Sequence, residues 1–418
     1  MTPQQQVEQS AQRAKTATAK LRTLSSAIKD AALHAMADAL IARQEELFVA
    51  NARDLETGRE RGLSEAMLDR LKLNENRVQQ MAEGCRQVAS LPDPVGRVIS
   101  GWTQPNGLKI EQLRTPLGVI GVIYESRPNV TVEAAVLCLK AGNAVVLRGG
   151  SEAIHSNVLL AQIISQAASA AGVPDGAIEI IETTDRAATN HMVTLNEYID
   201  LVVPRGGENL KKSLSAVATV PLIFAAGGVC HIFVDESADL KQAVEVVHNA
   251  KVQRPSTCNA LETLLLHSAT AAEQLPPIAK RLEESGVELR GDEASQAIVP
   301  SIKPASEDDW YAEYGGLTLA VRVVDGLDSA IAHIETYGTG HSDAILTQNF
   351  SNAEEFVGRV DSAAVYVNAS TRFTDGFEFG LGAEVGISTQ KLHARGPMGL
   401  EALTTTKYVV RGDGQLRA

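Results

Sequence analysis

The chain has 418 residues, of which 44% are apolar, 4% aromatic and 21% charged, and its formal net charge at pH 7 is -13. This length and composition are those of a globular protein with room for two domains and a large core. The acidic balance argues against a nucleic-acid backbone or an anionic membrane surface as the main partner, although a local basic pocket could still hold a phosphate. Small molecules are therefore the expected ligands.

The cysteines and the absence of long apolar runs give the expected compartment. Cys85, Cys138, Cys230 and Cys258 lie far apart, with no C-x-x-C pair and no cluster with histidine at metal-ligand spacing, which favours a reducing compartment and no metal site. The first thirty residues are polar and mixed in charge, unlike a secretory signal, and no run is long enough to span a bilayer. We expect a cytoplasmic protein without a bound metal.

The N-terminal part predicts helices. Apolar residues recur at spacings of three and four between residues 5 and 51 and again between 64 and 88, as on the buried face of an amphipathic helix. Alternating segments around Asn106-Gly107 then give a strong signal for a β-hairpin. Residues 404–411 predict one more strand. A hairpin and a terminal strand outside the main pattern are typical of an assembly element.

The middle of the chain alternates strands and helices. This alternation is typical of a doubly wound parallel sheet, in which ligands bind at the carboxyl ends of the strands. A second alternating unit begins at His231. The expected fold class is therefore α/β, with two doubly wound parallel-sheet domains and a small β-hairpin arm. The predicted strands are 119–123, 144–147, 178–181 and 201–203 in the first unit, and 231–234, 263–266, 319–324, 344–346 and 363–367 in the second.

Two loops of the first unit favour a nucleotide. Arg148–Glu152 (RGGSE) and Pro204–Glu208 (PRGGE) each place an arginine and paired glycines directly after a strand, where backbone can approach a phosphate closely. Either loop alone could be an ordinary strand-to-helix turn. The sequence contains neither G-x-G-x-x-G nor G-x-x-x-x-G-K-[ST], so a standard Rossmann fingerprint or P-loop is not supported.

One cysteine stands in a setting that suits chemistry. Cys258 lies in VQRPSTCNALETLLL, from Val252 to Leu266, and Pro255 must end the helical pattern that precedes it. A thiol at such a break can face a cleft, where Arg254 and backbone N–H groups could stabilise the reactive thiolate. An isolated cysteine is more often a small buried hydrophobe, and the local residues alone favour that structural interpretation.

Seven motifs are spread over nearly the full length of the chain. They are AN-x-x-DL from Ala50, RTPLGVIGVIYESRPNV from Arg114, LKAGNAVVLRGGSEA from Leu139, PRGGENL from Pro204, QRPSTCNALETLL from Gln253, AEYGG from Ala312 and VYVNASTRFTDGFEFGLGAEVGIS from Val365. Taken together, these motifs resemble the aldehyde dehydrogenase superfamily, and most closely its gamma-glutamyl phosphate reductase family. This resemblance turns Cys258 from a structural cysteine into the expected nucleophile.

The resemblance also implies a domain organisation. The cofactor domain is expected at residues 1–99 and 119–231, with 368–402 returning to it, and the catalytic domain at 232–367. The oligomerisation arm is expected at 100–118 and 403–418. Such an arm implies a homo-oligomer.

The resemblance assigns a pyridine nucleotide and its contacts. Asn129 matches the family's side-chain oxyanion donor, which acts with the backbone N–H of Cys258, and Glu313 stands where the family binds the nicotinamide ribose. Arg148 and Arg205 would suit a 2′-phosphate, so NADPH is favoured over NADH. The remaining expected contacts are Gly149, Gly150, Ser151 and Glu152 near the adenosine ribose, and Pro204, Gly206, Gly207 and Glu208 near the pyrophosphate.

The reaction implied by the resemblance is reduction of L-glutamate 5-phosphate to L-glutamate 5-semialdehyde, which cyclises to 1-pyrroline-5-carboxylate for proline biosynthesis. Ala225 takes the place of the glutamate that activates water in the hydrolytic relatives, two residues before Gly227-Gly228. Candidates for the phosphate are Arg254, Ser256 and Thr257, and for the amino-acid end Asn259, Ser370, Arg372 and Asp375. The labile acyl phosphate suggests a complex with a glutamate kinase.

Other functions stay open at this point. The chain could oxidise an aldehyde to a free acid or to a coenzyme A thioester, although Ala225 argues against the free acid. It could also be a non-catalytic nucleotide-binding homologue, which the joint presence of Cys258, Asn129 and Glu313 disfavours. A thiol-dependent hydrolase would need a base, for which His248 or His267 could approach in space.

Overall fold

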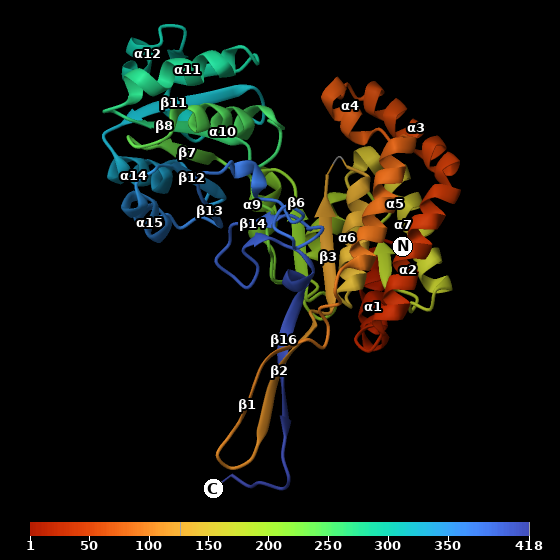
Figure 1. Cartoon of the computed structure of the whole chain (residues 1–418). Coiled ribbons are helices and arrows are strands. Elements are labelled where there is room, and N and C mark those ends of the chain that lie inside the picture. Colours follow the sequence, from red (N-terminus) through yellow and green to blue (C-terminus); the bar gives the residue numbers. More distant parts are fainter. Residues whose placement is uncertain (126, 418) are drawn as a thin grey trace. The chain divides into compact units, whose positions relative to one another are not determined.

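The three-dimensional structure, a computed structural model, describes residues 1–125 and 127–417 and their side chains apart from those of Ala66 and Glu208. It divides into two compact units (Figure 1). Unit 1 comprises residues 1–225, 380–386 and 398–418, and unit 2 comprises residues 226–379 and 387–397. The segment 368–402, expected as a whole with the cofactor domain, is thus shared between the two units. Within the described residues, no helix is long and apolar enough to cross a membrane.

Unit 1 begins with a layer of helices, as the sequence predicts. The continuous helical pattern is cut by polar caps: the side chains of Ser25, Ser64 and Asn74 accept hydrogen bonds from the backbone N–H groups of Ile28, Met67 and Arg77, which starts a new helix at each point. The helices are α1 (Pro3–Leu21), α2 (Ser26–Ala42), α3 (Gln44–Glu60), α4 (Glu65–Leu71) and α5 (Glu75–Ser90).

A parallel four-stranded sheet forms the centre of unit 1. Its strand order is β5 (Ile178–Ile180), β4 (Ala144–Arg148), β3 (Val119–Tyr124), β6 (Leu201–Arg205). The chain leaves β3 toward β4 and later returns to its other side as β6, so the loops after β3 and β6 flank a topological switch point. Its helices are α6 (Asn129–Lys140), η1 (Ser151–Ala153), α7 (Ile154–Ala170), α8 (Arg186–Met192) and α9 (Glu208–Ser215).

The predicted hairpin is confirmed. Strands β1 (Val98–Thr103) and β2 (Lys109–Pro116) pair antiparallel, and β16 (Thr404–Arg411) pairs along the full length of β2. The turn uses Gly107 at φ 89°, a backbone conformation that favours glycine. Every residue of β1 is exposed, and the three strands extend away from the sheet of unit 1 (Figure 1).

Unit 2 contains a seven-stranded sheet in which every neighbouring pair is parallel. The sequence missed β9, β10, α12 and α13, which are too short to show a period. The strand order is β10 (Lys303–Pro304), β9 (Glu288–Gly291), β11 (Thr318–Val324), β8 (Leu261–His267), β7 (Cys230–Val234), β12 (Ser342–Leu346), β13 (Ala364–Val367). The helices are α10 (Leu240–Val252), α11 (Ala271–Glu283), α12 (Glu293–Ile298), α13 (Glu307–Trp310), α14 (Leu327–Tyr337) and α15 (Phe350–Arg359).

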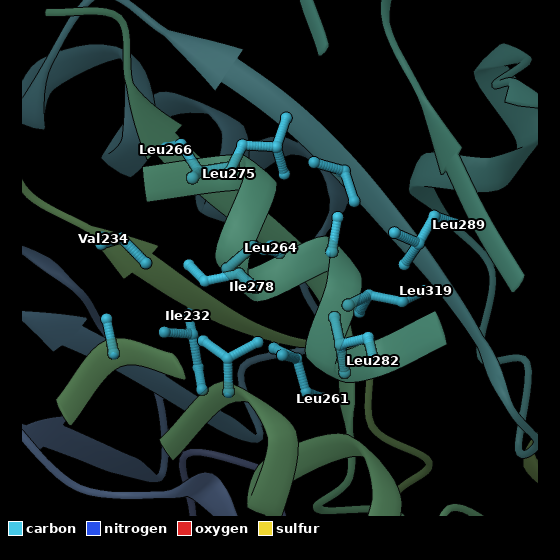
Figure 2. Packing of buried hydrophobic residues seen from close by; sticks show 14 of the residues in the cluster. Ile232, Val234, Leu261, Leu264, Leu266, Leu275, Ile278, Leu282, Leu289 and Leu319 are labelled. Atoms are coloured by element: carbon cyan, nitrogen blue, oxygen red, sulfur yellow. The ribbon is translucent and has the colours of Figure 1, made fainter. Parts of the chain in front are cut away.

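Apolar side chains cover both faces of this sheet, and Leu264, Leu265 and Leu266 of β8 are accordingly all buried. On one face, residues of β7 and β8 such as Ile232 and Leu264 pack against Ile278 of α11 (Figure 2). On the other, Phe233 and Leu265 pack with residues of α14 and α15. The returning segments add η2 (Thr371–Phe373) and the pair β14 (Ile387–Ser388) and β15 (Gly396–Pro397) to unit 2, and η3 (Leu400–Leu403) to unit 1.

Candidate active site

Cys258 occupies a tight turn between α10 and β8. The hydroxyl of Thr257 donates to the carbonyl of Arg254 at 2.8 Å, and the N–H of Ala260 donates to the carbonyl of Thr257 at 3.0 Å. The turn leaves Cys258 partly exposed, whereas the other three cysteines are buried. Burial raises the pKa of the Cys85 and Cys138 thiols to about 12, so these thiols are inert. Cys258 is therefore the cysteine placed for reaction.

The start of β7 supports the carbonyl of Cys258. The thiol of Cys230 donates to this oxygen at 3.2 Å. A Cβ atom on Gly228 would lie 1.7 Å from the same oxygen, so only glycine allows the two backbones to approach so closely. This contact fixes the peptide unit that carries the Cys258 thiol.

A second loop of unit 2 holds the other side of the turn. The Asn259 amide donates to the carbonyl of Thr374 at 2.9 Å, and the hydroxyl of Thr371 donates to the carbonyl of Asn259 at 2.7 Å. Arg372 hydrogen-bonds to the Asn259 side-chain oxygen. The side chain of Asn259, expected as a substrate contact, is thus used to join two loops.

The guanidinium groups of Arg254 and Arg372 both lie close enough to the Cys258 turn to interact electrostatically. Burial lowers the pKa of Arg372, Arg254 lowers it further, and Cys258 raises it. Arg254 is exposed and Arg372 is half-buried. Because Arg372 interacts electrostatically with both Arg254 and Cys258, the two arginines place positive charge near the cysteine. Such a field suits a dianionic leaving group.

The remaining predicted substrate residues differ in their surroundings. Ser256 is exposed. Ser370 is buried, and its hydroxyl accepts the N–H of Arg372 at 3.3 Å. The Asp375 carboxylate accepts the N–H of Phe377 at 2.9 Å. Ser370 and Asp375 thus both shape the loop that meets the cysteine turn.

Glu313 lies on an exposed loop after α13. A Cβ atom on Gly227 would lie 2.2 Å from Glu313 Oε2, so this carboxylate rests against the glycine backbone. The neighbouring Gly315 donates its N–H to Glu262 Oε1 at 3.1 Å. Within unit 2, Glu313 and Cys258 therefore both lie near the amino ends of the central strands β7 and β8.

The RGGSE loop of unit 1 is closely packed. Arg148 donates to the carbonyls of Gly149 and Thr184, each at 3.0 Å. Burial lowers its pKa, which Glu152 raises in part. A Cβ atom on Gly149 would lie 2.1 Å from Asn157 Nδ2, and one on Gly150 would lie 2.2 Å from Glu152 Oε1. Gly149 is thus required by the packing of the loop, whereas an added Cβ at Gly150 meets only the movable carboxylate of Glu152. Ser151 begins the short helix η1 that follows.

The PRGGE loop is more open. Pro204 is buried at the end of β6, and the side chain of Arg205 forms no hydrogen bond or ion pair with the residues that the structure describes. A Cβ atom on Gly206 would lie 2.6 Å from Leu210. Gly207 is the N-cap of α9, whose first backbone N–H groups form a general anion site. The side chain of Glu208, predicted as a further contact, lies outside the described residues.

Asn129, the predicted oxyanion donor, is the first residue of α6 in unit 1. Its side-chain amide donates to Glu133 Oε1 at 2.7 Å. The amide is therefore oriented by the next turn of its own helix.

Unit 1 also contains a cavity of about 340 Å³ next to the RGGSE loop. The helical wall of this cavity could not be predicted from the sequence, because Arg61 and its neighbours occur in a pattern that predicts only packing. The cavity is lined by Thr57, Gly58, Arg61, Leu63, Met67, Glu125, Ser151 and Glu152.

The chain is similar to known enzymes over its full length. The model of the aldehyde dehydrogenase family matches residues 1–310. The gamma-glutamyl phosphate reductase of Moorella thermoacetica is 58% identical over 99% of both chains, and that of Halothermothrix orenii is 55% identical over 100% of both. The chain belongs to the gamma-glutamyl phosphate reductases of the aldehyde dehydrogenase family. It is an oxidoreductase of that family.

The structural comparison confirms the predicted fold class. The crystal structure of gamma-glutamyl phosphate reductase from Thermotoga maritima matches with a TM-score of 0.97 at 50% identity, covering 99% of this chain and all of that one. An acetylating aldehyde dehydrogenase from Geobacillus thermoglucosidasius matches with a TM-score of 0.70 at 18% identity, covering 100% of this chain and 98% of that one. The second likeness shows the fold alone.

The histidines considered for a thiol hydrolase are placed elsewhere. His267 ends β8, whereas Cys258 precedes the first residue of that strand, so the strand separates them by its length of about 20 Å. His248 Nε2 hydrogen-bonds with the hydroxyl of Ser285 at 2.8 Å. The structure thus gives no support to either as the base for Cys258.

Proposed function

We propose that this gamma-glutamyl phosphate reductase reduces L-glutamate 5-phosphate with NADPH to L-glutamate 5-semialdehyde and phosphate. The product would cyclise to 1-pyrroline-5-carboxylate, an intermediate of proline biosynthesis. The observation that carries the proposal is the partly exposed Cys258 in a turn flanked by Arg254 and Arg372, in a chain 58% identical to an enzyme of that name.

In the proposed mechanism, the Cys258 thiolate attacks the acyl carbon of the substrate. Asn129 and the backbone N–H of Cys258 hold the oxyanion, a contribution of roughly 3 kcal/mol for one such donor. The phosphate leaves toward Arg254, Ser256 and Thr257, and a thioester remains on Cys258. NADPH, when bound, supplies the reducing equivalent that converts the thioester to the level of an aldehyde. Collapse of the resulting thiohemiacetal releases the aldehyde and the thiol.

Ala225 supports phosphate over water as the acyl acceptor in the reverse direction. A methyl side chain cannot accept a proton, so the position that holds the water-activating glutamate in hydrolytic relatives has no base here. The substrate's amino-acid end is assigned to Asn259, Ser370, Arg372 and Asp375. Arg372 and Asp375 carry the charges that could pair with an α-carboxylate and an α-amino group.

The residues of unit 1 fit a pyridine dinucleotide. Arg148 to Glu152 would contact the adenosine ribose, Pro204 to Glu208 the pyrophosphate, and Glu313 of unit 2 the nicotinamide ribose. Support comes from close-packed glycines after β4 and from the helix N-terminus at Gly207. Arg205, which has no partner among the described side chains, is available for the charge of a 2′-phosphate.

Assembly and location are further parts of the proposal. We assign unit 1 apart from residues 100–118 and 403–418 to the cofactor domain, unit 2 to the catalytic domain, and residues 100–118 and 403–418 to an oligomerisation arm. The exposed β1 edge supports a homo-oligomer. The four unbridged cysteines support a reducing cytoplasm. A complex with a glutamate kinase would protect the labile acyl phosphate.

The test runs the reaction in reverse, from stable reagents. Pyrroline-5-carboxylate and NADP⁺ are supplied with and without inorganic phosphate, and NADPH absorbance is followed. NADPH should form only when phosphate is present. A rate that ignores phosphate overturns the proposal, and a rate that requires coenzyme A instead supports the coenzyme A-acylating alternative.

A further inference from the structure

A buried ion pair brackets the turn that carries Cys258. Lys251 lies in the last turn of α10, and Glu262 is the second residue of β8. Lys251 Nζ and Glu262 Oε2 are 2.6 Å apart, and both side chains are fully buried. The pair therefore closes the base of the loop, seven residues before and four residues after the cysteine.

The same pair reaches the loop that carries Glu313. The second carboxylate oxygen of Glu262 accepts the N–H of Gly315 at 3.1 Å. Lys251 Nζ lies 5.7 Å from the centre of the Tyr314 ring, within the range of a cation–π contact. Gly315 has φ +59°, a conformation that favours glycine, so the loop bends where its N–H meets the carboxylate.

We propose that the Lys251–Glu262 pair is a positioning clasp, which closes the Cys258 turn and holds the Glu313 loop in register with it. The inference rests on the proposed function, because it takes Glu313 as the ligand of the nicotinamide ribose. Neither residue of the pair touches substrate; both act through the backbone they hold.

Burial of charge supports a positioning role. Burial raises the pKa of Glu262 and lowers that of Lys251, while each partner opposes the shift of the other. A buried ion pair commonly gives little net stability compared with an apolar pair of similar size, but its hydrogen-bonding geometry is strict. Glu262 uses both oxygens, one for each loop, which an apolar pair cannot reproduce.

Two double variants distinguish the Lys251–Glu262 ion pair from the hydrogen bond between Glu262 and Gly315. Lys251→Met with Glu262→Leu removes both the clasp and the acceptor for Gly315, without leaving an unpaired charge. Lys251→Met with Glu262→Gln removes the clasp but keeps an oxygen for the Gly315 N–H. The matched control is Lys29→Met with Asp93→Asn, which removes another lysine–carboxylate pair, 2.6 Å apart and with a buried lysine, in unit 1.

The readouts are the NADPH dissociation constant by fluorescence, the rate of Cys258 alkylation by iodoacetamide, kcat, and the thermal midpoint. In the Met/Leu variant, the NADPH dissociation constant should rise about tenfold and kcat should fall about tenfold. The rate of Cys258 alkylation should change about tenfold, in either direction. The Met/Gln variant should recover NADPH binding to within about threefold, with alkylation still altered. The control should change the thermal midpoint alone.

Two results overturn the clasp: native NADPH binding and native alkylation in the Met/Leu variant, or failure of the Met/Gln variant to recover NADPH binding. Both readouts are independent of turnover. If the native protein shows no phosphate-dependent reaction, the proposed function fails, while alkylation still decides whether the pair positions the cysteine turn.

Discussion

The two units are both built on parallel sheets, but they place their candidate functional residues at opposite ends of the strands. In unit 1, Arg148 and Arg205 are the last residues of β4 and β6, where ligands of parallel sheets usually bind. In unit 2, Cys258 comes before the first residue of β8, and its support Cys230 is the first residue of β7. The carboxyl edge of a sheet thus coincides with the proposed cofactor residues here, but not with the proposed nucleophile.

The carboxyl edge of unit 2 shows why. Asp235, directly after β7, accepts hydrogen bonds from the hydroxyls of Thr347 at 2.6 Å and Ser237 at 2.9 Å, and from the amide of Asn352. Burial raises the pKa of Asp235, but these hydrogen bonds lower it more, so it stays a carboxylate. The carboxylate of Asp235 is therefore already engaged by neighbouring side chains.

The prediction with the largest expected effect tests whether the reaction takes place at the amino ends of the strands of unit 2. Cys258→Ala should lower phosphate-dependent turnover by about four orders of magnitude or more, because no thioester can form. NADPH binding should stay nearly native, since the dinucleotide loops lie in unit 1. The assay is the reverse reaction followed by absorbance, with binding measured separately.

Cys85→Ala is the matched control, since Cys85 is fully buried among the helices of unit 1. It should retain native turnover. Substantial activity in Cys258→Ala would falsify the nucleophile assignment and remove the contrast between the two sheet edges.

Substitutions of two adjacent glycines test whether close backbone packing positions Cys258. Gly228→Ala would place a Cβ 1.7 Å from the backbone oxygen of Cys258, whereas Gly227→Ala meets only the movable carboxylate of Glu313 at 2.2 Å. We expect turnover to fall about a hundredfold in Gly228→Ala, because the nucleophile is displaced, and only a few-fold in Gly227→Ala. Similar kcat values in the two variants, with similar thermal midpoints, would contradict this account of the turn.

Acidification should affect unit 2 through two buried histidines. Burial lowers the pKa of His333 to about 3 and that of His341 to about 4, below the ordinary value near 6.5. The stability from keeping each ring neutral is present above pH 6.5 and is lost as pH falls toward these values. At pH 5 the loss is about 2 kcal/mol for each histidine, or roughly 5 °C in a midpoint.

His333→Asn provides the variant, because its side-chain oxygen can replace Nδ1 as the acceptor of Arg322, 3.0 Å away. The thermal midpoint of this variant should fall less between pH 7.5 and pH 5 than that of the native protein. His34→Asn, at an exposed position of α2, should follow the native curve. Parallel curves for His333→Asn and the native protein would show that His333 does not contribute.

The fold could be predicted from the sequence because its elements carry strong local signals. The apolar strands and the Asn106-Gly107 turn are specified by residues close in the chain. The sequence did not indicate β9, which is short, or the breaks before α2 and α5, where one polar cap divides a continuous helical pattern. Such breaks depend on a single hydrogen bond and leave the apolar period unchanged.

The site was harder to predict, because its parts come from distant segments. Local residues favoured a structural Cys258, and only the family resemblance reversed that interpretation. The sequence predicted Asn259 as a substrate contact but did not indicate that its amide also joins the cysteine turn to Thr374. No pattern linked Lys251 to Gly315 through Glu262, since a buried charge pair has no periodic signature.

The smallest expected effect concerns the two arginines at the carboxyl edge of unit 1. Arg148 already donates to the carbonyls of Gly149 and Thr184, whereas Arg205 has no such partner among the described residues. Arg205→Ala should therefore raise the KM for NADPH about tenfold, equal to about 1.4 kcal/mol, and change the KM for NADH little. Arg148→Ala should raise both KM values by a similar factor, because it loosens the loop rather than removing a phosphate contact. Steady-state kinetics with both nucleotides gives the comparison. Equal rises for NADPH and NADH in Arg205→Ala would assign Arg205 to the pyrophosphate instead, and the discrimination between nucleotides would then lie elsewhere on this edge.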